Sequence, residues 1–164
     1  MRVNTREELA ATPEEVYAVV TDPAFQQAKC EATTVGGPFS AEVSGGQAGA
    51  RVHTERELPT SDLPDVVRSF VGEHLTIVEV FDWAAPGADG SREAALDLHV
   101  KGAPVTLKGT LRLQPTATGT LETLDAELKA NVPFIGGKIE KSASGPITTA
   151  ITIETELLRK WLAR

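Results

Sequence analysis

The chain has 164 residues, a length that suits one domain and is short for two. Hydrophobic residues make up 41% of it and charged residues 24%, which is ordinary for a folded globular protein. With 16 basic against 23 acidic residues, the formal net charge is −7, so the surface repels nucleic-acid phosphates and anionic lipid headgroups. We therefore expect a single domain over residues 1–164, with no nucleic-acid partner.

Cysteine usage and the N-terminal residues bear on the compartment. Cys30 is the only cysteine, which excludes an intrachain disulfide and a metal site built from several cysteines. We interpret it as a small buried thiol in a reducing compartment. Residues 1–6 contain no apolar segment of a secretion signal, and no stretch approaches the about 18 apolar residues of a membrane span. These features predict a cytoplasmic protein without an integral membrane segment.

The N-terminal part predicts an edge strand followed by two short helices. Residues 1–9 are polar but extended in character. Thr12 then provides a helix N-cap, Pro13 suits the first helical position, and Glu15 completes a capping box. A second short helix is expected over residues 25–29. The pair lacks the basic second helix with which a helix-turn-helix protein contacts DNA.

From residue 31 onward the hydrophobic period changes to two, which indicates β-strands. A first strand over 32–43 is expected to bend or bulge at Gly36-Gly37-Pro38, and a second strand covers 50–58. A helix over 63–72 interrupts the series, since its apolar residues have helical spacing. Four further strands follow, each with one apolar and one polar face, at 75–83, 93–101, 105–114 and 123–132.

The C-terminal segment predicts one long helix, because its apolar positions recur every three to four residues from Ile139 to Trp161. About 25 helical residues span roughly 37 Å, enough to cross a whole sheet. Proline in a helix removes a backbone donor and clashes with the preceding turn. Gly145-Pro146 is therefore expected to kink or interrupt this helix.

This order of elements predicts an α+β fold. A curved antiparallel sheet of about seven strands surrounds the long C-terminal helix, with two short helices after the first strand and one inserted helix. Such a sheet curls strongly, and a single helix cannot cover its full width. The inward-facing residues are mostly Leu, Val and Ala, and aromatic residues make up only 5% of the chain. An apolar cavity beneath the helix is expected; the alternative is a collapsed core without a usable cavity.

Several motifs resemble a known superfamily. Residues 9–23 resemble the opening of START-like (SRPBCC) domains, where a first strand leads into an Ala/Pro-Glu-x-Val-aromatic helix. Residues 132–140, with the pattern Val-Pro-x-x-Gly-Gly-Lys-x-Glu, and residues 56–59 are similar more narrowly to an uncharacterised bacterial family of that superfamily. The resemblance covers essentially the whole chain. It implies the helix-grip fold, with a hydrophobic-ligand cavity beneath the terminal helix.

Arg56 and Glu79 are the charged candidates for a site. Each lies on a strand face that is otherwise apolar, and the two strands are expected to pair across the inserted helix. A charge that faces a cavity is costly unless it is paired, so an Arg56–Glu79 contact is expected. In a functional role, Arg56 would orient a ligand carboxylate or enolate oxygen and Glu79 would hold Arg56. The alternatives are a structural salt bridge at the sheet rim, or a strand-face assignment that is off by one residue.

Other residues that can carry chemistry are assigned mainly structural roles. His53 and His99 fall on the expected outer face, His74 opens a strand, and their spacing is not that of a metal site, so no metal or cofactor is expected. Tyr17 either points its hydroxyl into the cavity mouth or packs against the sheet. Trp83 is interpreted as a core or rim aromatic residue, with a platform on which a ligand stacks as the alternative. None of the glycine pairs fits a phosphate-binding fingerprint.

We hypothesise that the protein binds or carries a small hydrophobic molecule, lipid- or polyketide-like, in the central cavity, as a monomer or homodimer. One alternative is an enzyme of the cyclase, dehydratase or isomerase type that acts on a hydrophobic substrate in the same cavity. A second alternative is an adaptor that docks a partner protein. The residues predicted to bind the ligand are Tyr17, Val52, Thr54, Arg56, Phe70, Glu79, Phe81, Trp83, Leu96, Leu98, Leu107, Leu111, Leu128, Ile139, Ala143 and Ile147.

Overall fold

Seven strands and four helices make up the structure, a computed structural model that describes residues 1–164. The predicted α+β arrangement is confirmed, with two short helices after the first strand, one inserted helix and a long terminal helix. In chain order the elements are β1 (Arg2–Leu9), α1 (Pro13–Val20), α2 (Pro23–Thr33), β2 (Phe39–Gly46), β3 (Gly49–Pro59), α3 (Asp65–Val71), β4 (His74–Trp83), β5 (Arg92–Val100), β6 (Val105–Pro115), β7 (Thr120–Ala130) and α4 (Gly136–Leu162).

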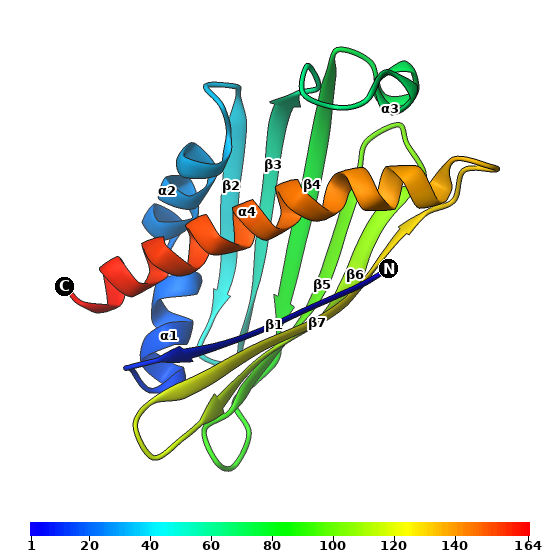
Figure 1. Cartoon of the computed structure of the whole chain (residues 1–164). Helices are drawn as coiled ribbons and strands as arrows, with labels where there is room; N and C mark the ends of the chain where they lie inside the picture. Colours follow the sequence, from blue (N-terminus) through cyan, green and yellow to red (C-terminus); the bar gives the residue numbers. More distant parts are fainter.

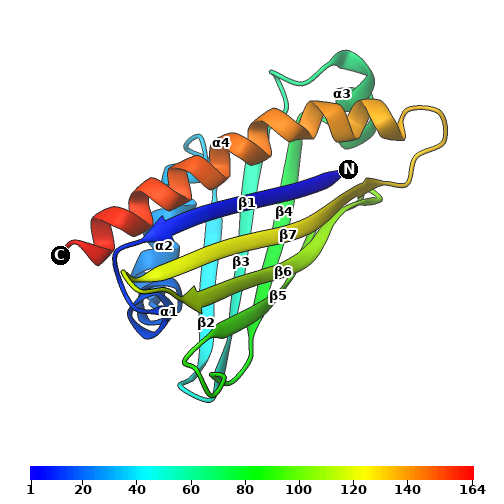
Figure 2. The same cartoon turned by 60° about the horizontal axis from the view of Figure 1, so that its bottom comes forward.

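The strands form one antiparallel sheet in the order β1-β7-β6-β5-β4-β3-β2. β1 is an edge strand, as expected, because it pairs only with β7. The sheet is curved, and α4 crosses its concave face as a single long rod (Figure 1). The turned view shows α4 above β1, with α1 and α2 near its C-terminal end (Figure 2). The close neighbours of α4 are α1, α2 and β7, so this helix bridges the two sides of the curved sheet.

Local sequence signals place the first two helices. The Thr12 hydroxyl oxygen accepts a hydrogen bond from the Glu15 backbone N–H at 3.2 Å, so the expected N-cap is present. Asp22 caps α2 in a similar way. α2 then continues to Thr33, so the strand expected over 32–43 is wrong in its first part, and β2 begins only at Phe39. The chain turns between α2 and β2 at Gly36, whose left-handed φ of 73° suits glycine.

Two clusters of buried apolar side chains form the interior. The first joins α1, α2 and the C-terminal half of α4 to the sheet, and it contains Val16 and Phe25. The second lies on the β5–β7 side of the sheet, near the start of α4, and it contains Leu107 and Ile139. The sheet therefore has apolar packing at both ends of α4.

β6 and β7 approach each other closely at Gly109. A Cβ atom at this position would lie 2.1 Å from the backbone oxygen of Asp125 and 2.5 Å from Cα of Ala126. Only glycine fits such an approach, and glycine inside a strand commonly marks a bend. Gly109 thus allows the sheet to curl around α4.

The interruption expected at Pro146 is absent, because α4 is continuous from Gly136 to Leu162. Proline normally clashes with the residue before it, and here that residue is Gly145, which has no Cβ. The carbonyl that loses its helical donor belongs to Ser142, four residues earlier, which is only half-buried, so water can satisfy it. The helix therefore reaches across the whole sheet.

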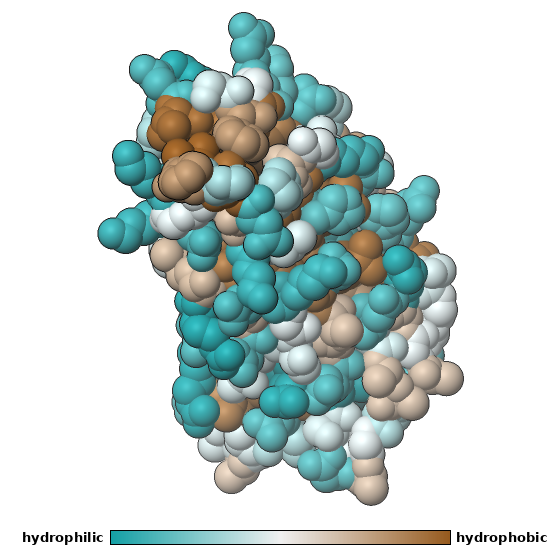
Figure 3. Space-filling view, turned by 90° about the vertical axis from the view of Figure 1, so that its right-hand side faces the viewer, coloured by the Kyte–Doolittle hydropathy of each residue, from teal (hydrophilic) through white to brown (hydrophobic).

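Apolar side chains are exposed at one end of the molecule. Figure 3 shows them gathered near α3 and the start of α4. Val66 and Phe70 on α3 are 38% and 46% exposed, and Phe134, just before α4, is fully exposed. None of the four helices is both long and apolar enough to cross a membrane.

Candidate functional site

A network of charged side chains lies between α2 and the inner face of β3 and β4. Lys29 Nζ lies 2.6 Å from Glu79 Oε1, and Arg56 Nη2 lies 3.4 Å from Glu79 Oε2. The exposed fractions of Lys29, Arg56 and Glu79 are only 1%, 7% and 8%. The expected Arg56–Glu79 contact is therefore present, and both side chains face the interior as the strand pattern predicted. Lys29 is a partner that the sequence pattern did not identify.

Helix and strand geometry bring this network together. Lys29 and Thr33 are one turn apart on α2, so both face the sheet, and Thr33 Oγ1 accepts a hydrogen bond from Arg56 at 2.8 Å. Thr54 is directly opposite Glu79 in the β3–β4 register, and its hydroxyl donates to Glu79 Oε1 at 3.4 Å. Both carboxylate oxygens of Glu79 thus have donors, which offsets the cost of burying the charge.

The three charges stabilise one another in their ionised forms. Burial opposes the charge on Lys29, but the carboxylates of Glu154 and Glu79 outweigh this effect and raise the pKa of Lys29. Burial also opposes the charge on Glu79, but Lys29 and Arg56 prevail and lower the pKa of Glu79 to about 2. At neutral pH the network is therefore an internal salt bridge.

A second group of carboxyls lies on the inner face, where α4 passes β7 and β1. Glu122 on β7 is directly opposite Glu7 on β1. Removal from water, together with the charges of Glu154 and Glu7, raises the pKa of Glu122 to about 7. Burial also raises the pKa of Glu154 on α4, although Lys29 opposes this shift. Arg159 donates to Glu7 at 2.9 Å, so Glu122 itself has no paired cation.

A small cavity lies beside these carboxyls. Its volume is about 50 Å³, room for a few water molecules at about 10–15 Å³ each. Seven of its 12 lining residues are hydrophobic. The polar lining consists of Thr5, Gln26, Glu122, Glu154 and Thr155, without any Lys, Arg or His.

We define the inner apolar face as the inward-facing side chains of the central strands β4, β5 and β6. Other parts of the protein cover this face incompletely. Ile77, Leu98 and Leu111 on this face are only half-buried. Ile147 and Ile151, on the facing side of α4, are half-buried as well. The backbone of α4 lies closest to α1, α2 and β7, and its side chains Ala143, Ile147 and Ile151 pack against the buried cluster on β5–β7, leaving part of the inner face half-buried.

Tyr17 packs in the core. Its hydroxyl donates to the Gly46 carbonyl, its ring meets Trp83 edge-on with centroids 5.6 Å apart, and the Arg92 guanidinium lies 3.7 Å from the ring centre. These contacts match the packing alternative for Tyr17. They do not leave its hydroxyl free at a cavity mouth.

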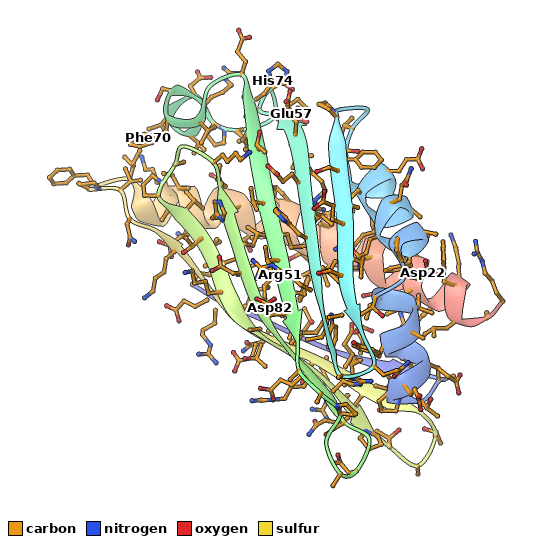
Figure 4. The ribbon with its side chains drawn as sticks, turned by 180° about the vertical axis from the view of Figure 1, so that it is seen from behind. Asp22, Arg51, Glu57, Phe70, His74 and Asp82 are labelled. Carbon is orange, nitrogen blue, oxygen red and sulfur yellow. The ribbon has the colours of Figure 1, made fainter.

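The other residues predicted to bind the ligand fall into different environments. Phe81, Trp83 and Leu111 line the cavity. Phe70 lies on the surface of α3, outside the cavity lining (Figure 4). The salt bridge contains Arg56 and Glu79. Six others are buried: Val52, Thr54, Leu96, Leu107, Leu128 and Ile139. Three are half-buried beneath or along α4: Leu98, Ala143 and Ile147.

The outer face of the sheet is mostly polar, apart from the buried Val78 and Val80 on β4. Arg51 and Asp82 form an exposed ion pair at 3.4 Å between adjacent strands, and His74 lies at the α3 end of this face (Figure 4). An open depression beside Arg51 and His53 has only one hydrophobic residue among the six that line it. No three His, Cys, Asp or Glu side chains are grouped so that they could hold a metal ion.

Lys29, Glu122 and Glu154 are the charged residues of the site that the sequence analysis missed. Lys29 follows the buried Phe25 by one helical turn. Glu122 continues the inward-facing alternation of Leu124 by one step toward the start of β7. Glu154 lies within the apolar stripe of α4. In each case the sequence shows a charged residue at a position where the periodic pattern of the helix or strand calls for an apolar one.

Sequence comparison places the chain in a family. The family model described as "Protein of unknown function (DUF2505)" matches residues 4–162. An uncharacterised protein of Mycobacterium tuberculosis is 28% identical over 137 residues, which cover 82% of this chain and 75% of the relative. This match extends over most of both proteins.

Solved structures share the fold at low sequence identity. The Zhui aromatase/cyclase from Streptomyces sp. R1128 has a TM-score of 0.64 and 13% identity, with 100% of this chain and 94% of that chain covered. A Thalictrum flavum norcoclaurine synthase mutant has a TM-score of 0.58 and 13% identity, with 99% and 94% covered. These neighbours are of the helix-grip type that the motifs implied. The chain therefore belongs to the DUF2505 family of proteins of unknown function and has the helix-grip fold of START-like domains.

Proposed function

We propose that the protein binds a small apolar molecule between α4 and the inner apolar face of β4–β6. The observation that carries the proposal is the incomplete burial of this face, although it points into the concave interior. Covering apolar surface contributes about 25 cal/mol per Å². A ligand that covers the half-buried side chains of Ile77, Leu98 and Ile147 therefore gains binding free energy.

The cavity limits how such a ligand lies. Its volume is about 50 Å³, so it holds only one end of a ligand. The rest of the molecule lies along the half-buried side chains, where α4 must shift outward to admit it. Since α4 takes no part in the strand pairing, such a shift spares the pairing of the central strands.

The fold neighbours support the proposal by analogy. A norcoclaurine synthase with this fold is in complex with a transition-state analogue, and another protein with this fold is an aromatase/cyclase. These cases indicate that the fold accommodates small organic molecules, but they assign no substrate to this chain.

Filling the cavity tests the proposal. Ile151 lines the cavity and Thr149 is exposed on the same helix, so Ile151→Trp and Thr149→Trp form a matched pair. We expect the wild type and Thr149→Trp to take up an apolar fluorescent dye, and Ile151→Trp to take up much less. Native mass spectrometry of the purified wild type should also show a copurified small molecule. A wild type without dye uptake and without a copurified molecule would contradict the proposal.

A second candidate function, proton-transfer catalysis of the cyclase or isomerase kind, is favoured by Glu122. General acid–base catalysis is most efficient when the pKa lies near the working pH, and the pKa of Glu122 is raised to about 7. Arg56 and Glu79 are less suited to this role, because they are held in the salt bridge. A panel of ketones in deuterated buffer should exchange protons in the presence of the wild type, and not with Glu122→Gln. Equal exchange with both proteins would exclude Glu122 as the base.

A further inference from the structure

One of the residues that line the cavity, Gln26, carries a buried hydrogen-bond acceptor without a partner. Gln26 is 2% exposed, and its side-chain Nε2 donates to the Val20 carbonyl at 2.6 Å. This bond fixes the orientation of the amide, and Oε1 is left without any hydrogen-bond partner. A buried unpaired acceptor is costly, so the cavity favours a ligand that brings a donor.

The carboxyls of Glu122 and Glu154 in the same wall are only weakly compensated by positive charge, because burial outweighs the nearby cations and raises the pKa of both. The lining contains no cationic side chain. Glu154 forms an ion pair with Lys29, whose Nζ lies 3.8 Å from Glu154 Oε1. The same Nζ lies closer to Glu79 Oε1, at 2.6 Å. On the other side, Arg159 pairs with Glu7. A positive group in the cavity would therefore meet two carboxyls that the protein itself leaves undercompensated.

We propose that the bound molecule is an apolar amine, whose protonated nitrogen enters the cavity between Gln26, Glu122 and Glu154. This inference rests on the proposed binding function and specifies its ligand class. An ammonium group has three N–H donors and no acceptor, which matches one amide oxygen and two carboxyls. The cavity of about 50 Å³ has room for the nitrogen and the first carbon atoms. The alkyl or ring portion then lies against Leu111 and Ile151.

Other head groups suit this wall less well. A carboxylate would place a third negative group beside Glu122 and Glu154 and would leave Gln26 Oε1 without a donor. A hydroxyl satisfies Gln26 but adds no charge. The expectation that Arg56 receives a ligand carboxylate is not supported, because Arg56 is absent from the cavity lining and is bonded to Glu79 and Thr33.

Amine binding should depend on pH through Glu122. The charged groups around it are Glu7 from β1, together with Glu154 and Arg159 from α4, and Lys29 from α2 lies beyond Glu154. Below about pH 7 the Glu122 carboxyl is protonated in the free protein, so a bound cation has to displace that proton. The affinity for an amine should therefore fall as the solution is acidified, whereas the affinity for a neutral alcohol should not.

Calorimetric titration of the full chain with octylamine, octanol and octanoic acid tests the inference. At about pH 8 we expect octylamine to bind about tenfold tighter than octanoate, the change that one charge-assisted hydrogen bond produces. At about pH 6 octylamine should bind several-fold more weakly than at pH 8. Glu122→Gln should weaken octylamine about tenfold and reduce this pH dependence to the part that Glu154 contributes, while Gln26→Leu should weaken both octylamine and octanol.

Glu127→Gln is the matched control, because Glu127 lies on the same strand but on the opposite face. It should bind octylamine as the wild type does. Equal loss of affinity in Glu127→Gln and Glu122→Gln would show non-specific attraction to the acidic surface, and would overturn the inference. Octanoate binding as tightly as octylamine would overturn it as well, while leaving the binding function intact. If none of the three compounds binds and no apolar dye is taken up, the proposed binding function itself fails.

Discussion

Removal of Lys29 from the buried salt bridge should destabilise the protein far more than removal of a surface charge. With an effective dielectric constant near 20, the Lys29–Glu79 pair at 2.6 Å contributes about 6 kcal/mol of attraction and the Arg56–Glu79 pair at 3.4 Å about 5 kcal/mol. Desolvation offsets much of this. Because Lys29→Met leaves Glu79 buried with only one cation, we expect the free energy of unfolding to fall by about 3–5 kcal/mol.

Urea unfolding, followed by fluorescence of Trp83 and Trp161, measures this loss. Both indoles pack against other rings in the native state, so their emission should report unfolding. Arg51→Met is the control, since Arg51 and Asp82 form a pair on adjacent strands whose side chains are 58% and 53% exposed. Removing an exposed pair costs about 0–1 kcal/mol.

A double-mutant cycle separates the pair from its surroundings. Glu79→Gln alone leaves Lys29 and Arg56 without their shared carboxylate, so it too should cost about 3–5 kcal/mol. Combined with Lys29→Met, it should cost clearly less than the sum of the single losses, by about 2 kcal/mol. Additive losses, or a Lys29→Met variant no less stable than Arg51→Met, would refute the view that the two charges hold each other in the interior.

Three further predictions concern pH, the thiol and the helix. The pKa of Glu122 is raised to about 7 from an ordinary 4.5, so the folded state holds this proton more tightly than the unfolded state does. The free energy of unfolding should therefore decline as the pH rises through this window. Urea unfolding at about pH 5 and 7 should show a smaller decline for Glu122→Gln than for the wild type. Burial raises the pKa of Cys30, so a thiol reagent should label it slowly in the native protein and completely in urea; native labelling at the rate of free cysteine would contradict this. Pro146→Ala should raise the free energy of unfolding by about 1–3 kcal/mol, because alanine restores a helical donor at an exposed position; a less stable variant would show that Pro146 has a role in packing.

The fold was largely predictable because its signals are local. The period-two alternation of β4 to β7, the cap at Thr12 and the 3.6-residue stripe of α4 are each read within a short segment of chain. The strand expected over 32–43 failed where two local signals competed, since residues 30–33 extend α2 after its predicted end. The helix break expected from Pro146 did not occur either, because the preceding Gly145 lets the helix continue. The proline by itself did not indicate this.

The site was predictable only where both partners stand out against an apolar pattern. Arg56 and Glu79 lie in phase with inward-facing residues of paired strands, so their contact followed from strand alternation and pairing. The positions of Lys29 and Glu154 depend on how α2 and α4 pack against the sheet. No periodicity specifies that packing, because it arises from contacts between segments that are distant in sequence.

The sequence by itself therefore determined the order of the elements, the apolar inner face and the pairing of Arg56 with Glu79. Only the tertiary structure decided that Lys29 completes this salt bridge, and that Glu122 and Glu154 share a small cavity with the unpartnered Gln26. The physical reason is that burial and charge compensation depend on distances in space. Those distances are set when α2, α4 and the curved sheet come together.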